Sequence, residues 1–209
     1  MSQQSDGPRR RPPVALAIPG IIALIFLLLP LVGLLIKAPW SVFLTKLSEP
    51  GVFDALWLSL VTATETTAIC LAFGIPLAWL LARTSLPGRR LWRNLVMVPM
   101  ILPPVVGGVA LYTALGRQGF IGHWLYDTFN VSIPFTQAAV VIAQTFVAMP
   151  FLIITVDGAL RTSDGRLEEA AATLGASRWM VFWRITLPSV GPAVAAGAVL
   201  SWARALGEF

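Results

Sequence analysis

The stretch EEAAATLGASRWMVFWRITLP, residues 168–188, is amphipathic although apolar runs lie on both sides of it. In its first half, apolar residues recur three and four positions apart, which predicts one stripe along a helix of about two turns. Asp164 suits the N-cap position of this helix. Glu168 and Glu169 fall in its first turn, where carboxylates favour the positive end of the helix dipole. The members of the stripe are Leu167, Ala170, Ala171 and Leu174.

Gly175 predicts the end of this helix, because glycine adopts the left-handed conformation that terminates helices without a steric penalty. Ser177 can then cap a second short helix that carries a stripe of three aromatic residues. These are Trp179, Phe182 and Trp183. Pro188 marks the end of the second helix, so residues 164–188 are expected to form two short helices joined at a glycine elbow.

The chain as a whole has the composition of a membrane protein. Hydrophobic residues make up 56% of the 209 residues, charged residues 12%, and the mean hydropathy is +0.78. A water-soluble domain of this size would aggregate with such a composition. The net charge of +5 does not indicate nucleic-acid binding, because the arginines form short clusters between apolar runs. We therefore expect membrane lipid, and no nucleic acid, among the partners.

Five runs are close to the roughly 20 apolar residues that cross the hydrocarbon layer of a membrane. We expect an all-α, polytopic helix bundle with five spans. The second run contains one charge, Glu65, and Arg204 interrupts the fifth near its end. The runs are Val14–Ile36, Ala55–Ala82, Leu95–Leu115, Ala138–Val156 and Ser189–Ala203.

Arginine clusters predict the topology, since cytoplasmic loops carry the excess of Lys and Arg. The clusters are Arg9–Arg11 before the first span, Arg83, Arg89, Arg90 and Arg93 after the second, and Arg161, Arg166, Arg178 and Arg184 between the fourth and fifth. The opposite loops carry Lys37, Lys46 and Arg117. The sequence thus predicts a cytoplasmic tail over residues 1–13, a membrane domain over 14–209, and a cytoplasmic position for residues 164–188.

The first run is expected to be an uncleaved helix, because the sequence after it, residues 36–39, lacks an A-x-A cleavage pattern.

Proline and glycine recur inside the spans and predict bent helices, whose freed carbonyls find partners in neighbouring helices or water. Pro103, Pro104, Gly107 and Gly108 either serve ordinary helix packing or mark a hinge or pore wall.

Two physical explanations fit the helix pair of residues 164–188. The pair can lie in the headgroup layer, with its aromatic side chains in lipid and its arginines outward. It can equally bind a protein partner, because Ala170, Ala171 and Ala172 offer little apolar area to lipid but allow close approach. Both explanations remain open on these grounds.

The spacing of this stretch resembles the EAA motif of the membrane subunits of bacterial ABC importers. The motif fixes Glu-Ala-Ala, a glycine after three more residues, and Ile-x-Leu-Pro after a further nine, and every fixed position is present. The resemblance implies that the segment forms coupling helices that sit in a cleft of an ATPase subunit. The matching residues are Glu169, Ala170, Ala171, Gly175, Ile185, Leu187 and Pro188.

Other stretches, from about Ser59 onward, are similar to the molybdate permeases and the related sulfate permeases. They are LGRQG at 115–119, PFT at 134–136, AMPF at 148–151 and, above all, ARALGEF at 203–209. The resemblance implies a type I importer permease that moves a tetrahedral oxyanion by alternating access, and it favours molybdate over sulfate or thiosulfate. Family members continue through another helix after G-E-F. We therefore expect a sixth span that these residues do not include, and a carboxyl terminus on the outer side.

The same resemblance implies the partners and the location. A second copy of the chain would complete the pore, cytoplasmic ABC ATPase subunits would bind ATP, and an extracytoplasmic oxyanion-binding protein would deliver the substrate at a bacterial plasma membrane. The chain has no G-x-x-x-x-G-K-[ST] sequence, and its only lysines are Lys37 and Lys46. We therefore expect neither enzymatic activity nor a cofactor of its own.

Two ionisable positions within the spans are candidates for the substrate path. An intramembrane carboxylate such as Glu65 costs about 3 kcal/mol on insertion scales and ordinarily faces protein or water. It can be a hydrogen-bonded packing residue or a functional one. Arg204 and Glu208 are four residues apart, which predicts an ion pair on one helical face. Alternatively, the Arg204 guanidinium is a transient partner for a passing oxyanion.

Two other classes of protein are alternatives to the importer. An ion-coupled secondary carrier would use Glu65 as a proton site. An intramembrane enzyme is disfavoured by one histidine, one cysteine and no clustered carboxylates. A nucleotide-binding partner that copurifies with the chain would discriminate among the three.

Overall fold

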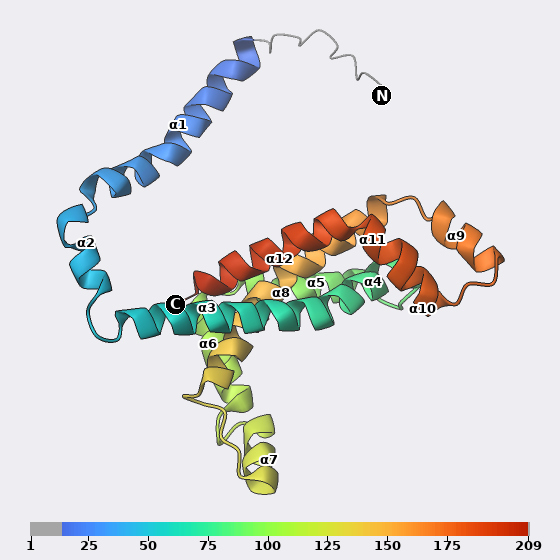
Figure 1. Ribbon diagram of the computed structural model, residues 1–209. Coiled ribbons are helices and arrows are strands. Elements are labelled where there is room, and N and C mark those ends of the chain that lie inside the picture. The colour runs from blue at the N-terminus through green and yellow to red at the C-terminus, as the bar shows by residue number, and fades with distance from the viewer. Residues whose placement is uncertain (1–13, 209) are drawn as a thin grey trace. The chain divides into compact units, whose positions relative to one another are not determined.

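The computed structural model describes residues 14–208, which form helices joined by short connections (Figure 1). The chain divides into two units, Met1–Phe53 and Asp54–Phe209. The predicted tail over residues 1–13, with its arginines, and Phe209 at the end of the ARALGEF stretch lie outside the described residues.

The first unit contains α1 (Val14–Lys37) and α2 (Trp40–Leu47). α1 agrees with the predicted first span to within one residue, and its apolar side chains are largely exposed. The Trp40 indole closes the connection by donating a hydrogen bond to the Leu35 carbonyl at 2.8 Å. An exposed apolar helix of this length suits a lipid environment.

The second unit is a helix bundle built around α8 (Gln137–Thr162), against which α4, α5 and α12 pack. α3, the π-helical turn η1 and α4 follow one another without a break and together span 32 residues, Val52–Arg83. The other elements are α3 (Val52–Ile69), η1 (Cys70–Gly74), α4 (Ile75–Arg83), α5 (Arg89–Ile101), α6 (Pro104–Leu115), α7 (Phe120–Phe129), α9 (Arg166–Thr173), α10 (Arg178–Val181), η2 (Phe182–Thr186, also π-helical), α11 (Leu187–Ser189) and α12 (Gly191–Leu206).

The second and fourth predicted spans are confirmed as Val52–Arg83 and Gln137–Thr162. The third run, predicted over Leu95–Leu115, is bent as its prolines indicated, since α5 and α6 meet at an angle of 112°. Leu102 and Pro103 are extended at the break, where Pro103 and Pro104 both lack the N–H that a continuous helix needs.

The fifth predicted span begins two residues later than expected, at Gly191, and runs to Leu206. A bend of 73° separates it from the helical segment Arg178–Ser189. In the described part of the chain, three helices are long and apolar enough to cross a membrane, or up to five if each bent pair is one span.

Leu152 of α8 lies where η1 and α12 pack closely against this helix. A Cβ added at Gly74 would lie 2.8 Å from Leu152 Cδ2, and one added at Gly197 would lie 2.9 Å from Leu152 Cδ1. The two glycines therefore let η1 and α12 close on a fully buried leucine. Small residues at such contacts provide the close packing that holds membrane helices together.

Gln144 is the polar centre of the bundle and is only 2% exposed. Its Nε2 donates to Thr62 Oγ1 at 3.3 Å and to the Ala205 carbonyl at 3.2 Å, and its Oε1 accepts from Thr66 Oγ1 at 2.9 Å. The side-chain amide thus joins α3, α8 and α12 through hydrogen bonds that water cannot supply in this position.

Replacing Gly197 with valine should destabilise the bundle by about 1–3 kcal/mol, because the added methyl groups would overlap Leu152. The unfolding midpoint of the purified protein in detergent, followed by tryptophan fluorescence, should fall by several degrees. Gly158→Val is the matched control, since Gly158 is exposed and no atom lies within 4 Å of the place that a Cβ there would take. Equal losses in the two variants would contradict this account of the packing.

Candidate functional site

The helix that carries Glu169, Ala170 and Ala171 is α9. The predicted cap is displaced by one residue: Gly165 occupies the N-cap position, and the Asp164 carboxylate instead accepts a hydrogen bond from the Arg166 amide at 3.1 Å. No residue of α9 is buried. Glu169 and Ala170 are exposed and Ala171 is half-buried, so most of the Glu-Ala-Ala face is available for contact with another molecule.

The glycine elbow after α9 is confirmed. Gly175 has a φ of +85°, and its amide donates to the Ala172 carbonyl at 3.0 Å, while the Ala176 amide donates to the Ala171 carbonyl at 3.0 Å. This pair of hydrogen bonds is the Schellman motif, which satisfies the last carbonyls of a helix and requires a left-handed residue at this position. The elbow therefore has a defined geometry that depends on a glycine.

Ser177 caps the second short helix as predicted, since its hydroxyl accepts a hydrogen bond from the Met180 amide at 3.2 Å. The helix continues through the π-helical turn η2 into α11. The predicted aromatic stripe is confirmed as a cluster: Phe182 lies 6.2 Å from Trp179 and 5.4 Å from Trp183 between ring centroids, and 6.0 Å from Trp79 of α4. This cluster fixes α10 and η2 to the end of α4.

The structure separates the predicted coupling residues into two groups. Glu169 borders a hollow of about 470 Å³ between α9, α10 and the end of α4, and Gly175 is exposed at the elbow. Ile185 and Leu187 are half-buried, and Pro188 is exposed in α11, where the segment joins α12. Glu169 and Gly175 thus lie on the projecting part of residues 164–188. Ile185, Leu187 and Pro188 lie where this segment joins the bundle.

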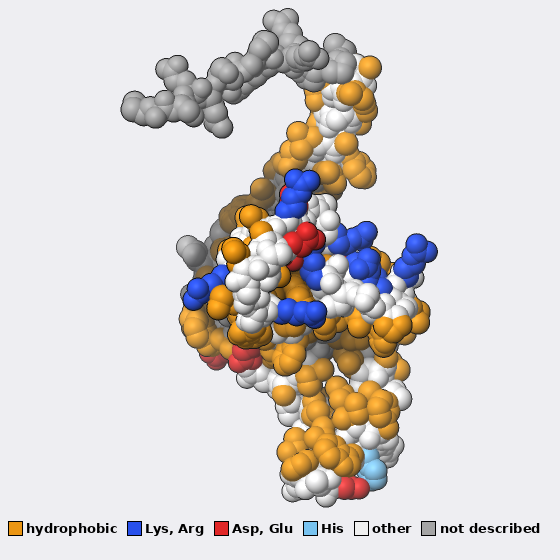
Figure 2. Space-filling view, turned by 90° about the vertical axis from the view of Figure 1, so that its right-hand side faces the viewer, with side chains coloured by type: hydrophobic (Ala, Val, Ile, Leu, Met, Phe, Trp, Pro, Cys, Tyr) orange, Lys and Arg blue, Asp and Glu red, His pale blue; other side chains and the backbone are white. Residues whose placement is uncertain are grey.

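Arginine side chains gather at the end of the second unit where α4 and α8 finish and α5 starts (Figure 2). We refer to this as the arginine-rich end. Its members are Arg83, Arg89, Arg90, Arg93, Arg161, Arg166, Arg178 and Arg184. α9 and α10 project from the same end of the bundle (Figure 1).

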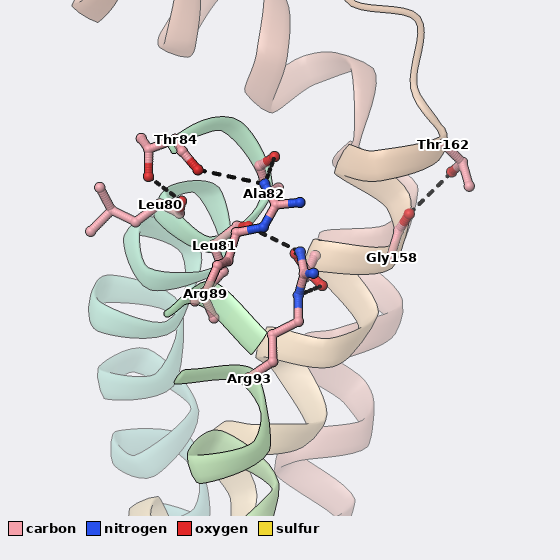
Figure 3. A network of polar contacts seen from close by, with 9 residues as sticks. Leu80, Leu81, Ala82, Thr84, Arg89, Arg93, Gly158 and Thr162 are labelled. Atoms are coloured by element: carbon pink, nitrogen blue, oxygen red, sulfur yellow. Dashed lines mark hydrogen bonds and ion pairs between the residues drawn. The ribbon is translucent and has the colours of Figure 1, made fainter. Parts of the chain in front are cut away.

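Arg93 is a residue that sequence reasoning counted only as a loop charge. Its side chain reaches from α5 to α4, where Nη2 donates to the Leu81 carbonyl at 2.9 Å (Figure 3). The same guanidinium binds Asp157 of α8 at two atoms, with distances of 3.0 Å from Nε to Oδ2 and 2.8 Å from Nη2 to Oδ1. The signal was Asp157 itself, since a carboxylate near the C-terminal end of an apolar helix opposes the helix dipole and needs a cation.

At the carboxyl-terminal end of α12, Arg204 forms the predicted ion pair with Glu208. Both side chains line a cavity of about 330 Å³ together with residues at the α5–α6 break, among them Pro103 and Gly107. The other lining residues are mostly apolar, and a guanidinium in such a cavity is a group that can bind anions once it is released from its carboxylate partner.

Glu65 is exposed on the surface of this chain, where its Oε2 accepts a hydrogen bond from Gln137 Nε2 at 3.1 Å. It borders a surface hollow with Ala68, Ile69 and Val141. The hydrogen bond agrees with a packing role, although the role of Glu65 itself stays a prediction. Glu65 does not lie in the cavity that Arg204 lines.

In the described residues, no group of three or more His, Cys, Asp or Glu side chains could hold a metal ion. The features that could carry function are thus a projecting pair of short helices at the arginine-rich end and a charged cavity at the helix break.

Comparison with known proteins covers most of the chain. Residues 74–209 match the family model described as binding-protein-dependent transport system inner membrane component. A molybdenum transport system permease protein ModB from Mycobacterium tuberculosis is 45% identical over 192 residues, which is 92% of this chain and 72% of that protein. A probable sulfate transport system permease protein cysT from Chlorokybus atmophyticus is 37% identical over 186 residues, which is 88% of this chain and 65% of that protein.

The fold is similar to that of a solved bacterial alginate ABC transporter in complex with alginate pentasaccharide-bound periplasmic protein. The TM-score is 0.70 at 23% sequence identity, and the match covers 90% of this chain and 70% of that chain. At this level of sequence identity, the likeness shows that the two chains share a fold.

Proposed function

This chain belongs to the family of binding-protein-dependent transport system inner membrane components, the membrane subunits of ABC importers, and we propose that it forms the path by which molybdate enters the cell. The observation that supports molybdate as the substrate is the 45% identity to a molybdenum permease over 92% of the chain, compared with 37% identity to a sulfate permease. The family membership does not support an ion-coupled carrier, because importers of this family are driven by ATP on a partner subunit.

The ATPase subunit is proposed to dock on the projecting part of residues 164–188. Three features support this position: the exposed face of α9, the small side chains of Ala170 and Ala171, and the fixed elbow at Gly175. The arginine-rich end supports a cytoplasmic position for this docking surface, because cytoplasmic loops carry the excess of positive charge. From the arginine clusters of the sequence we also propose a cytoplasmic amino terminus, in a bacterial inner membrane.

A second copy of the chain is proposed to complete the pore, and an extracytoplasmic binding protein is proposed to deliver the oxyanion. The large apolar area that this chain exposes supports contacts with both lipid and a second copy. Closure of the ATPase subunits on ATP would move the docked helices and so switch the pore between its two openings.

The complex of this chain with its ATPase subunits, reconstituted in liposomes, should hydrolyse ATP faster when the binding protein carries molybdate or tungstate than when it is empty. Sulfate should stimulate less, because a tetrahedral oxyanion of different size fits the same site less well. ATP turnover and uptake of the labelled oxyanion are the measurements. Stimulation by sulfate alone would replace molybdate with sulfate as the substrate, and the absence of any ATPase partner would contradict the importer function.

A cysteine at position 174 should react with a membrane-impermeant maleimide only from the cytoplasmic side, and a bound ATPase subunit should protect it. Leu174 is 88% exposed next to the elbow, and the native Cys70 is fully buried, so the new thiol dominates the reaction. Phe120→Cys on α7, an exposed position near the other end of the bundle, is the control that should react from outside. Reaction of Leu174→Cys from outside would overturn the proposed orientation and the docking surface together.

We propose that the Arg204 guanidinium is the anion partner in the pore. It lines the cavity at the α5–α6 break and is held by Glu208, with which an incoming oxyanion would compete. A planar guanidinium matches the oxygen atoms of a tetrahedral oxyanion, so exchange of one anionic partner for another is chemically reasonable.

Arg204→Gln should lower oxyanion uptake about tenfold to a hundredfold, the range expected for loss of a hydrogen bond to a charged group. Glu208→Gln is the control, because it removes the ion pair but keeps the guanidinium, and its uptake should stay close to that of the unmodified protein. Undiminished uptake by an assembled Arg204→Gln complex would rule out this role.

A further inference from the structure

Two arginines at the arginine-rich end connect helices that are distant in the sequence. Arg93 of α5 binds the Leu81 carbonyl of α4 and both carboxylate oxygens of Asp157 in α8. Arg83, the last residue of α4, donates from Nη2 to Glu168 Oε1 of α9 at 2.9 Å and to Ser163 Oγ at the end of α8 at 2.7 Å. We refer to Arg83, Arg93, Asp157 and Glu168 as the arginine clamp.

The clamp is partly buried. The side chains of Arg83 and Glu168 are each 20% exposed, and those of Arg93 and Asp157 are 18% and 11% exposed. When one partner of a partly buried pair is removed, the other is left as an uncompensated charge with little access to water, so the loss of either partner is costly. By contrast, the local pair between Arg166 and Asp164 is largely exposed and its atoms are 3.8 Å apart. The clamp is therefore a structural connection, whereas the exposed pair is not.

The two neighbouring glutamates of α9 point to different surroundings. Glu169 is exposed and belongs to the proposed docking face, whereas Glu168 is half-buried and paired with Arg83. Apolar packing gives α9 little support, since Leu167 and Leu174 are 66% and 88% exposed. Among the described residues, the bond between Glu168 and Arg83 is the one side-chain hydrogen bond or ion pair that ties α9 to a helix of the bundle.

From this arrangement we propose that Arg83 and Arg93 are positioning residues that make α9 and the ends of α4, α5 and α8 move as one body when the ATPase subunit shifts. The proposal rests on the proposed function and assigns the path of the force inside the subunit. Displacement of α9 pulls Arg83 and hence α4. Arg93 passes the displacement to α5 and α8, and α5 leads to the break at Pro103.

The test uses the complete complex in liposomes and compares basal ATP hydrolysis with the amount of oxyanion taken up per ATP. Glu168→Gln and Arg83→Gln should leave basal hydrolysis unchanged but lower uptake per ATP about two- to thirtyfold, the range that mutations along a coupling path produce. The double variant Arg83→Glu with Glu168→Arg restores an opposite-charge pair and should recover most of the lost uptake. A residue with a merely structural role would instead lower basal hydrolysis and uptake together.

Arg93→Gln should have the same effect, and Arg90→Gln is its matched control, because Arg90 lies on the same helix and is exposed. Should Arg93→Gln not assemble, Arg93→Lys takes its place, since lysine keeps the charge but cannot bind Asp157 with two nitrogen atoms of fixed geometry. Equal uptake per ATP in the clamp variants and the unmodified complex would overturn the proposal. If the unmodified complex itself moved no oxyanion, the proposed function would fail instead.

A second measurement needs no transport. Spin labels at Thr84→Cys, next to Arg83, and at Thr173→Cys, the last residue of α9, should give a narrow distance distribution in the otherwise unmodified complex and a broad one after Glu168→Gln. An unchanged distribution would show that α9 is held by something other than the clamp.

Discussion

The structure depends on the rule that a polar group removed from water must find its partner within the protein. Gln144 meets this rule with three hydrogen bonds, and Asp157 meets it through two nitrogen atoms of Arg93. Both sites lie on α8, the helix around which the second unit is built. Because the partners lie on helices other than α8, the same bonds that satisfy these groups also connect α8 to its neighbours.

The breaks in the helices follow from the same rule. At the α5–α6 break, Pro103 and Pro104 remove two backbone donors, so a straight helix would leave carbonyls without partners. The chain instead bends by 112° and opens a cavity that Arg204 and Glu208 line. The π-helical turns η1 and η2 show a second solution, in which the helix gains a residue but keeps its hydrogen bonds. Polar groups and bends therefore concentrate in the same parts of the bundle.

Much of the fold could be predicted because it depends on local sequence. Run length located α1, α3–α4 and α8, and the elbow followed from Gly175, since few other residues accept its positive φ. The angle of 112° between α5 and α6 could not be predicted, because two prolines indicate that a helix ends but not in which direction the chain continues. The candidate site could be predicted only where its residues are close in sequence, as in the Arg204–Glu208 pair. Arg93 and Asp157 are 64 residues apart, so no periodicity connects them, and the partner of such a charge depends on how the helices pack.

The position of the arginine clamp has a mechanical consequence. A short projecting helix can transmit a displacement only if it is held firmly to the rest of the subunit. The backbone alone does not hold α9 firmly, because the chain on either side of it consists of short non-helical links. Its carboxyl-terminal link leads through the aromatic cluster of Phe182 and Trp79 to α4. Arg83 ties Glu168 of α9 to the same end of α4. Two independent contacts on one helix end resist rotation as well as translation, which a single contact would not. These contacts thereby hold the short helices in orientation as well as in place.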